Sequence, residues 1–147
     1  MCGLVSVLNE SNGGHTNAIT ALAPMSGSNV LFASGSADNT VKVWEVSGGG
    51  QNGNVSLLHT FVGHSNWIST LLDLGNGLLA SGSWDNTVKV WKMGVDQALA
   101  TFQGHTHQVT GLSLAGNTCL ASVSADGTLR LWKIPTPESS IKCILGK

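Results

Sequence analysis

The strongest constraint on the fold is an eleven-residue pattern that the sequence repeats three times. A Gly-His pair precedes each copy, and the three histidines, His15, His64 and His105, lie 49 and then 41 residues apart. A period of about 40 to 50 residues is typical of proteins built from stacked repeats. The sequence therefore predicts three copies of one supersecondary unit. The three copies read SGSADNTVKVW (34–44), SGSWDNTVKVW (81–91) and SVSADGTLRLW (122–132).

Hydrophobic residues within a unit alternate with a period of two, as expected for strands rather than helices. In the segment TVKVW (40–44), Val41 and Val43 face one side of an extended chain, while Lys42 and Trp44 face the other. β-branched residues such as valine also fit a pleated surface well. We therefore expect strands at these places.

The second unit shows how many strands a unit contains. Apolar runs are separated by the turn Gly75-Asn76-Gly77, whose residues accept the positive φ that short hairpins require, and by the turn at Trp84-Asp85-Asn86. Each unit is predicted to be four short antiparallel strands. In the second unit the strands fall at about 67–74, 78–83, 87–93 and 98–103.

A four-stranded sheet that is apolar on both faces must be covered by neighbouring sheets. The order Gly-His, about two dozen residues and then S-x-S-x-D-x-T-x-x-x-W resembles the WD-repeat family of β-propellers, from about Gly14 to Ile134. The resemblance implies an all-β fold in which three four-stranded antiparallel blades form a partial, open propeller. We expect one domain over 1–147: an outer strand at 2–8, blades at about 14–62, 63–103 and 104–147, and a flexible insert at 47–54.

The resemblance also implies a chain of hydrogen bonds in each blade, which runs from the indole of a Trp through a Ser and a His to an Asp. Buried polar groups need partners, and a fully bonded network fixes one turn geometry. We therefore expect these residues to be structural. The matching residues are Trp44, Ser34, His15 and Asp38; Trp91, Ser81, His64 and Asp85; and Trp132, Ser122, His105 and Asp126.

Serine, histidine and aspartate are also the residues of a hydrolase triad. Here the trio occurs three times, each time with a Trp, and the sequence has no G-x-S-x-G motif. The pair His105 and His107 has no third metal ligand nearby in sequence. Gly48, Gly50 and Gly53 match G-x-G-x-x-G, but polar strand-forming residues follow instead of the helix that a dinucleotide site needs. We expect no catalytic residue, metal or cofactor.

Propellers of the WD-repeat type generally bind partners on the rim of one face, where loops precede the first strand and turns precede the third. Trp67 and Trp84 both fall at such positions in the second blade, whereas the other blades have Ala or Gln there. Trp is enriched among interface hot spots. We expect partner proteins or peptides to bind these two residues. The rim positions are Ala18, Thr20 and Ala37; Trp67, Ser69 and Trp84; and Gln108, Thr110 and Ala125.

The formal charge of -1 and the single arginine, Arg130, argue against nucleic acid, anionic membrane and phosphopeptide partners. The sequence contains no run of about 20 apolar residues, which is the length that spans a bilayer. Its first residues do not resemble a secretory signal. We expect an intracellular protein of the cytoplasm or nucleus. The predicted function is a non-catalytic protein–protein interaction scaffold. The alternative is the substrate-recognition or targeting part of a larger enzyme, such as a ubiquitin ligase or a kinase.

The number of blades leaves one question about assembly. Closed propellers generally have four to eight blades, whereas this sequence supplies three, so that an apolar sheet face stays uncovered at each end of the arc. Two explanations are open. The chain is part of a longer propeller, or it forms a homodimer that closes a six-bladed ring.

Overall fold

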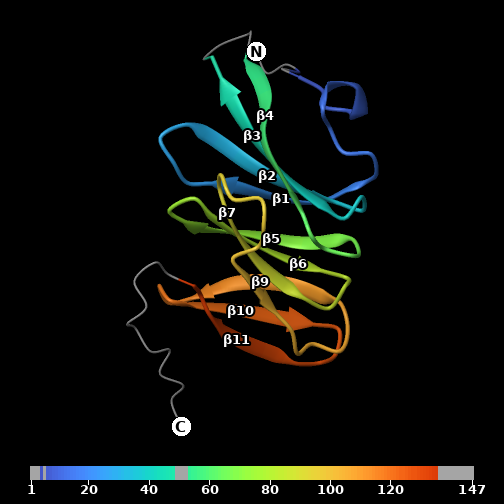
Figure 1. The fold of residues 1–147 in the computed structure, drawn as a ribbon, viewed down its shortest axis with the longest axis vertical. Helices are drawn as coiled ribbons and strands as arrows, with labels where there is room; N and C mark the ends of the chain where they lie inside the picture. Colours follow the sequence, from blue (N-terminus) through green and yellow to red (C-terminus); the bar gives the residue numbers. More distant parts are fainter. Residues whose placement is uncertain (1–3, 5, 49–52, 136–147) are drawn as a thin grey trace.

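The computed structural model describes residues 4, 6–48 and 53–135. These residues form three antiparallel sheets that stack face to face in an open arc, so the prediction of an all-β partial propeller is confirmed (Figure 1). The first sheet contains β1 (Ile19–Met25), β2 (Val30–Ser36), β3 (Thr40–Ser47) and β4 (Asn54–Val62). The second sheet contains β5 (Ile68–Gly75), β6 (Leu78–Ser83), β7 (Val88–Lys92) and β8 (Ala100–Phe102). The third sheet contains β9 (Val109–Ala115), β10 (Cys119–Ser124) and β11 (Leu129–Lys133).

Tight turns connect the second and third strands of every sheet. The residue after the Asp of the repeated pattern adopts a left-handed backbone conformation, with φ of 70° at Asn39, 73° at Asn86 and 80° at Gly127. Asn and Gly tolerate this conformation better than other residues. The repeated D-N-T and D-G-T triplets therefore specify the same turn in each sheet.

The core lies in two layers between the three sheets. Val41, Val43 and Phe61 of the first sheet pack against the second sheet, and Val88 and Val90 of the second sheet pack against the third. All four of these valines are fully buried, as the period-two pattern predicts. The second sheet is therefore covered on both faces, while the first and third are each covered by a neighbouring sheet on one face.

Two glycines permit the close approach of neighbouring sheets. A Cβ atom added at Gly35 would lie 2.8 Å from the Cβ of Ile68, and one added at Gly82 would lie 2.6 Å from Cγ1 of Val109. Both distances are too short for real carbon atoms. The glycine in the S-G-S segment is thus the place where a branched side chain of the next sheet enters.

The N-terminal segment differs from the expected strand over 2–8. Among its described residues, Leu4 and 6–8 lie outside any strand, and Glu10–Asn12 form one turn of 3-10 helix, η1, capped by Asn9. An outer strand needs a neighbouring strand for its hydrogen bonds, and the outer edge of the first sheet is already β4. Leu8 instead lines an apolar hollow beside Trp44.

The predicted insert at 47–54 is shorter than expected, because Ser47 of β3 pairs with Asn54 of β4 at the end of the ladder. The last part of the expected third blade, residues 136–147, lies outside the described residues. The third sheet therefore has three strands in the part of the chain that the structure describes.

We predict that Gly35→Ala lowers the free energy of unfolding by about 1–3 kcal/mol, because the added methyl group separates the first two sheets. Gly27→Ala is a suitable control, since its Cβ would meet only Leu31 Cδ1, at 3.7 Å, and the carbonyl oxygen of Asn29, at 4.0 Å. Urea denaturation of both variants measures the difference. Equal stability of the two would contradict the close packing inferred at Gly35.

Candidate functional site

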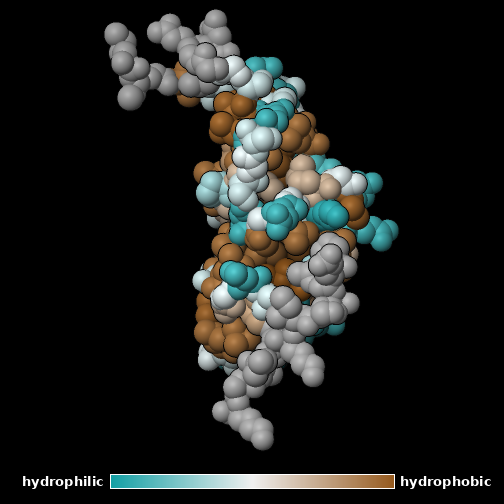
Figure 2. Space-filling view, turned by 90° about the vertical axis from the view of Figure 1, so that its left-hand side faces the viewer, coloured by the Kyte–Doolittle hydropathy of each residue, from teal (hydrophilic) through white to brown (hydrophobic). Residues whose placement is uncertain are grey.

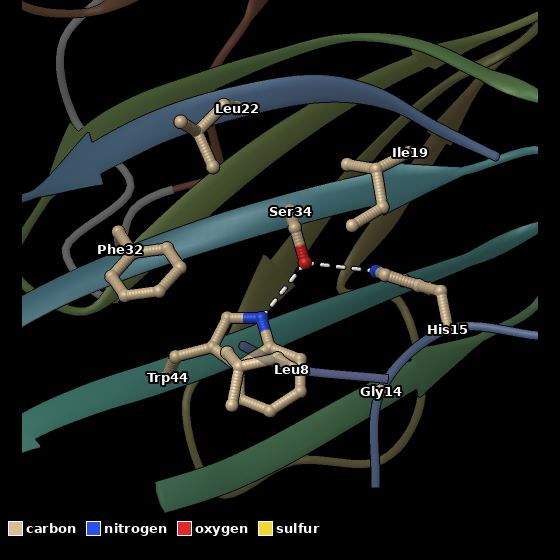
Figure 3. A pocket seen from close by; sticks show the side chains of 8 residues that line it. All are labelled: Leu8, Gly14, His15, Ile19, Leu22, Phe32, Ser34 and Trp44. Atoms are coloured by element: carbon tan, nitrogen blue, oxygen red, sulfur yellow. Dashed lines mark hydrogen bonds between the residues drawn. The ribbon is translucent and has the colours of Figure 1, made fainter. Parts of the chain in front are cut away.

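The hydrogen-bond chain of the first blade begins at a buried indole. Nε1 of Trp44 donates to Oγ of Ser34 at 2.8 Å, and Ser34 Oγ lies 2.8 Å from Nε2 of His15 (Figure 3). Nδ1 of His15 lies 2.8 Å from Oδ2 of Asp38. A neutral His with its proton on Nδ1 satisfies every group, because the Ser hydroxyl then donates to Nε2 and Nδ1 donates to the carboxylate.

The same arrangement recurs in the other two blades. From indole to carboxylate, the three distances are 2.8, 2.7 and 2.7 Å in the second blade and 2.8, 2.8 and 2.9 Å in the third. The structure thus brings together all twelve residues that the resemblance points to. They are Trp44, Ser34, His15 and Asp38; Trp91, Ser81, His64 and Asp85; and Trp132, Ser122, His105 and Asp126.

Each Asp receives four donors, which connect two separate loops. Asp85 accepts from His64 and from the backbone N–H of Ser65, and also from the N–H and hydroxyl of Thr87. Burial acts to raise the pKa of Asp85, but the hydrogen bonds from His64 and Thr87 outweigh it and hold the pKa well below its usual value. Because these donors come from both segments, Asp85 ties the loop before β5 to the turn before β7.

The carboxyl groups of the other two blades behave alike. For Asp38, burial is again opposed by hydrogen bonds from Thr40 and His15, and the pKa is lowered. For Asp126, the hydroxyl of Thr128 is the main cause of a lowered pKa, and it acts against burial. All three carboxylates are therefore charged at neutral pH, and each accepts hydrogen bonds from four donors.

The trio of Ser, His and Asp does not have the geometry of a hydrolase site. Ser34 is 2 % exposed and Ser81 and Ser122 are fully buried, and each hydroxyl oxygen accepts the indole N–H of its own blade. A nucleophile must reach a substrate carbonyl and have donors nearby for the oxyanion. Each of these buried hydroxyls instead bonds to the His and the Trp of its own blade.

The networks hold the rim positions in pairs. The loop before the first strand and the turn before the third are joined by a backbone hydrogen bond in each blade. The bond runs from Ala37 to Ala18 at 2.8 Å, from Trp84 to Trp67 at 2.9 Å, and from Ala125 to Gln108 at 3.0 Å. Six of the nine rim positions therefore form three bonded pairs, one per blade.

Only the pair in the second blade is aromatic. The rings of Trp67 and Trp84 stack with centroids 4.9 Å apart and planes inclined by 30°. Their side chains nevertheless remain open to solvent, with exposed fractions of 42% and 44%. Two stacked, exposed indoles form one continuous aromatic surface, and hot-spot residues at interfaces are commonly of this kind.

The rim around this pair carries little charge. In the loops and turns at 15–20, 36–40, 64–69, 83–87, 105–110 and 124–128, the charged side chains other than histidine are the three aspartates, and each is paired with its His. The equivalent pairs of the other two blades consist of small or amide residues, namely Ala18, Ala37, Ala125 and Gln108. The surface is therefore aromatic at the Trp pair, and its carboxylates are largely buried.

The three hydroxyl residues expected on the rim have a different environment from the Trp pair. The Thr20 hydroxyl donates to the carbonyl of Ile68 in the next blade, and the Ser69 hydroxyl donates to the carbonyl of Val109. Thr110 lies at the matching place of the third blade, 3.4 Å from the carbonyl of Val123. Thr20 and Ser69 thus connect blades, a role that sequence spacing alone does not reveal.

We predict that Ser81→Ala lowers the free energy of unfolding by about 1–3 kcal/mol, because the indole of Trp91 and Nε2 of His64 lose their shared partner inside the core. Urea denaturation monitored by fluorescence measures the loss. Ser65→Ala, at an exposed loop position, is the matched control and should change stability by less than about 0.5 kcal/mol. A variant Ser81→Ala as stable as the control would show that the network contributes nothing.

The lowered pKa values predict a loss of stability in acid. Carboxyl groups of the unfolded chain take up protons near the usual value of 3.8, while those of the folded chain stay charged to lower pH. Since the unfolded state then binds more protons, the contribution of these carboxylates to the free energy of unfolding falls as the pH drops from about 5 to 2. Urea midpoints across this range measure the effect. Asp85→Asn should flatten the profile, and an unchanged slope would exclude Asp85 as a cause.

In the described part of the chain, no helix is long and apolar enough to cross a membrane. The same residues contain no group of three or more His, Cys, Asp or Glu side chains that could hold a metal ion. His107, weighed above as a second metal ligand beside His105, accepts the backbone N–H of Gln108 at 3.0 Å through Nδ1.

Comparison with known proteins agrees with the repeat geometry. A search of curated proteins returned no match. The family model of the WD40 repeat, described as WD domain, G-beta repeat, matches residues 5–45, 55–92 and 96–133. These three matches cover most of the chain. The first contains β1, β2 and most of β3, the second contains nearly all of β4 with β5 to β7, and the third contains β8 to β11. The chain therefore belongs to the WD40 repeat family.

Proposed function

We propose that this protein is a non-catalytic scaffold that binds a protein or peptide partner on the rim holding Trp67 and Trp84. Domains of the WD40 family are generally protein-interaction scaffolds. The observation that carries the proposal for this chain is the stacked pair of indoles, which stays more than two-fifths exposed.

The fold does not require aromatic residues at these positions. The equivalent pairs, Ala18 with Ala37 and Gln108 with Ala125, make the same backbone hydrogen bond with small or polar side chains. Exposed Trp surface is costly in water and strengthens binding when a partner covers it, at roughly 25 cal/mol per Å² of apolar area. The two Trp side chains are therefore explained better by a partner than by the stability of the blade.

The support for the partner's chemistry comes from charge. A phosphopeptide needs clustered Arg side chains, and nucleic acid needs a basic surface. The rim has neither, since the loops and turns that form it contain no Lys or Arg side chain. An uncharged peptide segment with apolar or aromatic side chains fits this surface best.

The proposal predicts that the Trp pair dominates peptide binding. Peptides are selected from a displayed library on the immobilised chain, and their dissociation constants are then measured by fluorescence polarisation. Trp67→Ala and Trp84→Ala should each weaken binding at least tenfold, equivalent to about 1.4 kcal/mol.

Leu99→Ala provides a control for this experiment, because Leu99 is also 42% exposed but lies in the connection before β8. It should leave the dissociation constants unchanged. Circular dichroism confirms that each variant is folded. Selected peptides that bind the double variant Trp67→Ala/Trp84→Ala as tightly as the parent chain would refute the proposed site.

A further inference from the structure

The two ends of the arc expose sheet faces that are buried elsewhere in the molecule. We call the face of the first sheet turned away from the second the entry face, and the face of the third sheet turned away from the second the exit face. On the exit face, Leu129 is 62% exposed and Leu131 46%, whereas Val41 and Val43, which correspond to them in the first blade, are fully buried. Apolar surface also reaches solvent at several levels along one side of the arc (Figure 2). The exit face therefore has the composition of an interface between blades.

Both existing interfaces use one and the same fit. A branched side chain at the start of a first strand enters the space above a glycine in the second strand of the preceding blade. Ile68 enters above Gly35, and Val109 enters above Gly82. We call Ile68 and Val109 the knob residues, and each interface requires the residue facing the knob to lack a side chain.

A hydrogen bond accompanies each knob. The carbonyl oxygen of Ile68 accepts from Thr20, and the carbonyl oxygen of Val109 accepts from Ser69. Thr110 stands at the equivalent position of the third blade, where the Val123 carbonyl of its own blade, 3.4 Å away, is its hydrogen-bond partner among the described residues. Thr110 is thus placed to donate to the knob carbonyl of a further blade.

The third blade differs from the others at the place where a knob would enter. Val123 occupies the position of Gly35 and Gly82, and it is 41% exposed. Its cross-strand partner is Gly111, where the first two blades have Ala21 and Thr70. In the third blade the larger side chain of this pair therefore lies on the second strand, whereas in the first two blades it lies on the first strand. The exit face thus carries a protruding side chain where the corresponding faces of the other two blades have a space.

The entry face of the first blade has a knob of its own. Ile19 pairs with Ser36 in the same register as Ile68 with Ser83, and it is 56% exposed. If a second copy closed a six-bladed ring, Ile19 of one chain would meet Val123 of the other. A Cβ atom at Gly35 would lie 2.8 Å from Ile68 Cβ, so two branched side chains cannot share this space without separating the sheets.

We propose that the exit face of the third blade docks a further propeller blade that has Gly, Ala or Ser as its knob residue, and that Val123 with Ile19 prevents the chain from closing on a second copy of itself. The carbonyl of the small knob residue accepts from Thr110, and apolar side chains of the docked blade cover Leu129 and Leu131. This inference is independent of the Trp site, because it rests on the uncovered sheet faces at the ends of the arc and not on the rim.

The chain itself supplies the probe for this proposal, because its own entry face becomes a matching blade when Ile19 is shortened. Light scattering after size-exclusion chromatography gives the mass in solution. The parent chain should run as a monomer of 15.2 kDa. Ile19→Ala should form a dimer of twice that mass, with a dissociation constant at least tenfold lower than that of the parent.

A second variant tests the same fit from the other side. Gly111→Ala/Val123→Gly restores the pair that Ala21 and Gly35 form in the first blade, and it avoids placing two glycines opposite each other. It too should dimerise, whereas adding Ile19→Ala to it should weaken the dimer again, because a small residue would then face a glycine across a void. Val62→Ala, at a position that is 67% exposed on β4, is the control and should remain monomeric.

Three outcomes would overturn the proposal. The parent chain could form a closed dimer, Ile19→Ala could remain monomeric while circular dichroism shows it folded, or the control could dimerise as well as the variants. If the double variant fails to fold, Ile19→Ala alone decides, since Ile19 is exposed and its shortening creates no cavity in the core.

Discussion

The structure depends on the packing of sheets that are apolar on both faces. Residues at alternate positions of the third strands in the first two sheets, such as Val43 and Val90, are buried because another sheet lies against them. A single blade would expose these side chains, and each would cost roughly 1.5–3 kcal/mol relative to burial. Stability is therefore shared between neighbours, as in other repeat proteins, and the glycines Gly35 and Gly82 set how closely neighbours approach.

The hydrogen-bond networks connect the packed core to the surface loops of each blade. The indole of Trp91 is fixed between two blades, where it stacks on Phe61 at 5.1 Å, and its N–H begins the series that ends at Asp85. Asp85 in turn fixes the loop and the turn that carry Trp67 and Trp84. The exposed aromatic pair is thus presented by a rigid support, which lowers the entropy lost when a partner binds.

Much of this arrangement could be predicted from the sequence because it repeats. The strands and the D-N-T turns follow from three aligned copies, and the twelve residues of the networks from the resemblance to the WD-repeat family. The contacts between blades could not be predicted, since the roles of Thr20 and Ser69 depend on carbonyl groups 48 and 40 residues away. The N-terminal segment was also mispredicted as a strand at its described residues. Its alternating pattern favours a strand, but a strand forms only where a neighbouring edge is free to pair with it.

The central claim is that burial by neighbouring sheets contributes more to stability than the internal hydrogen bonds of a blade. Hydrogen–deuterium exchange of the intact chain tests it most directly, since protection reports the local free energy of opening. The second sheet is covered on both faces, so backbone amides of β6 and β7 should exchange more slowly than the corresponding amides of β10 and β11. Equal or greater protection in β10 and β11 would show that each blade is stable by itself and would contradict the account.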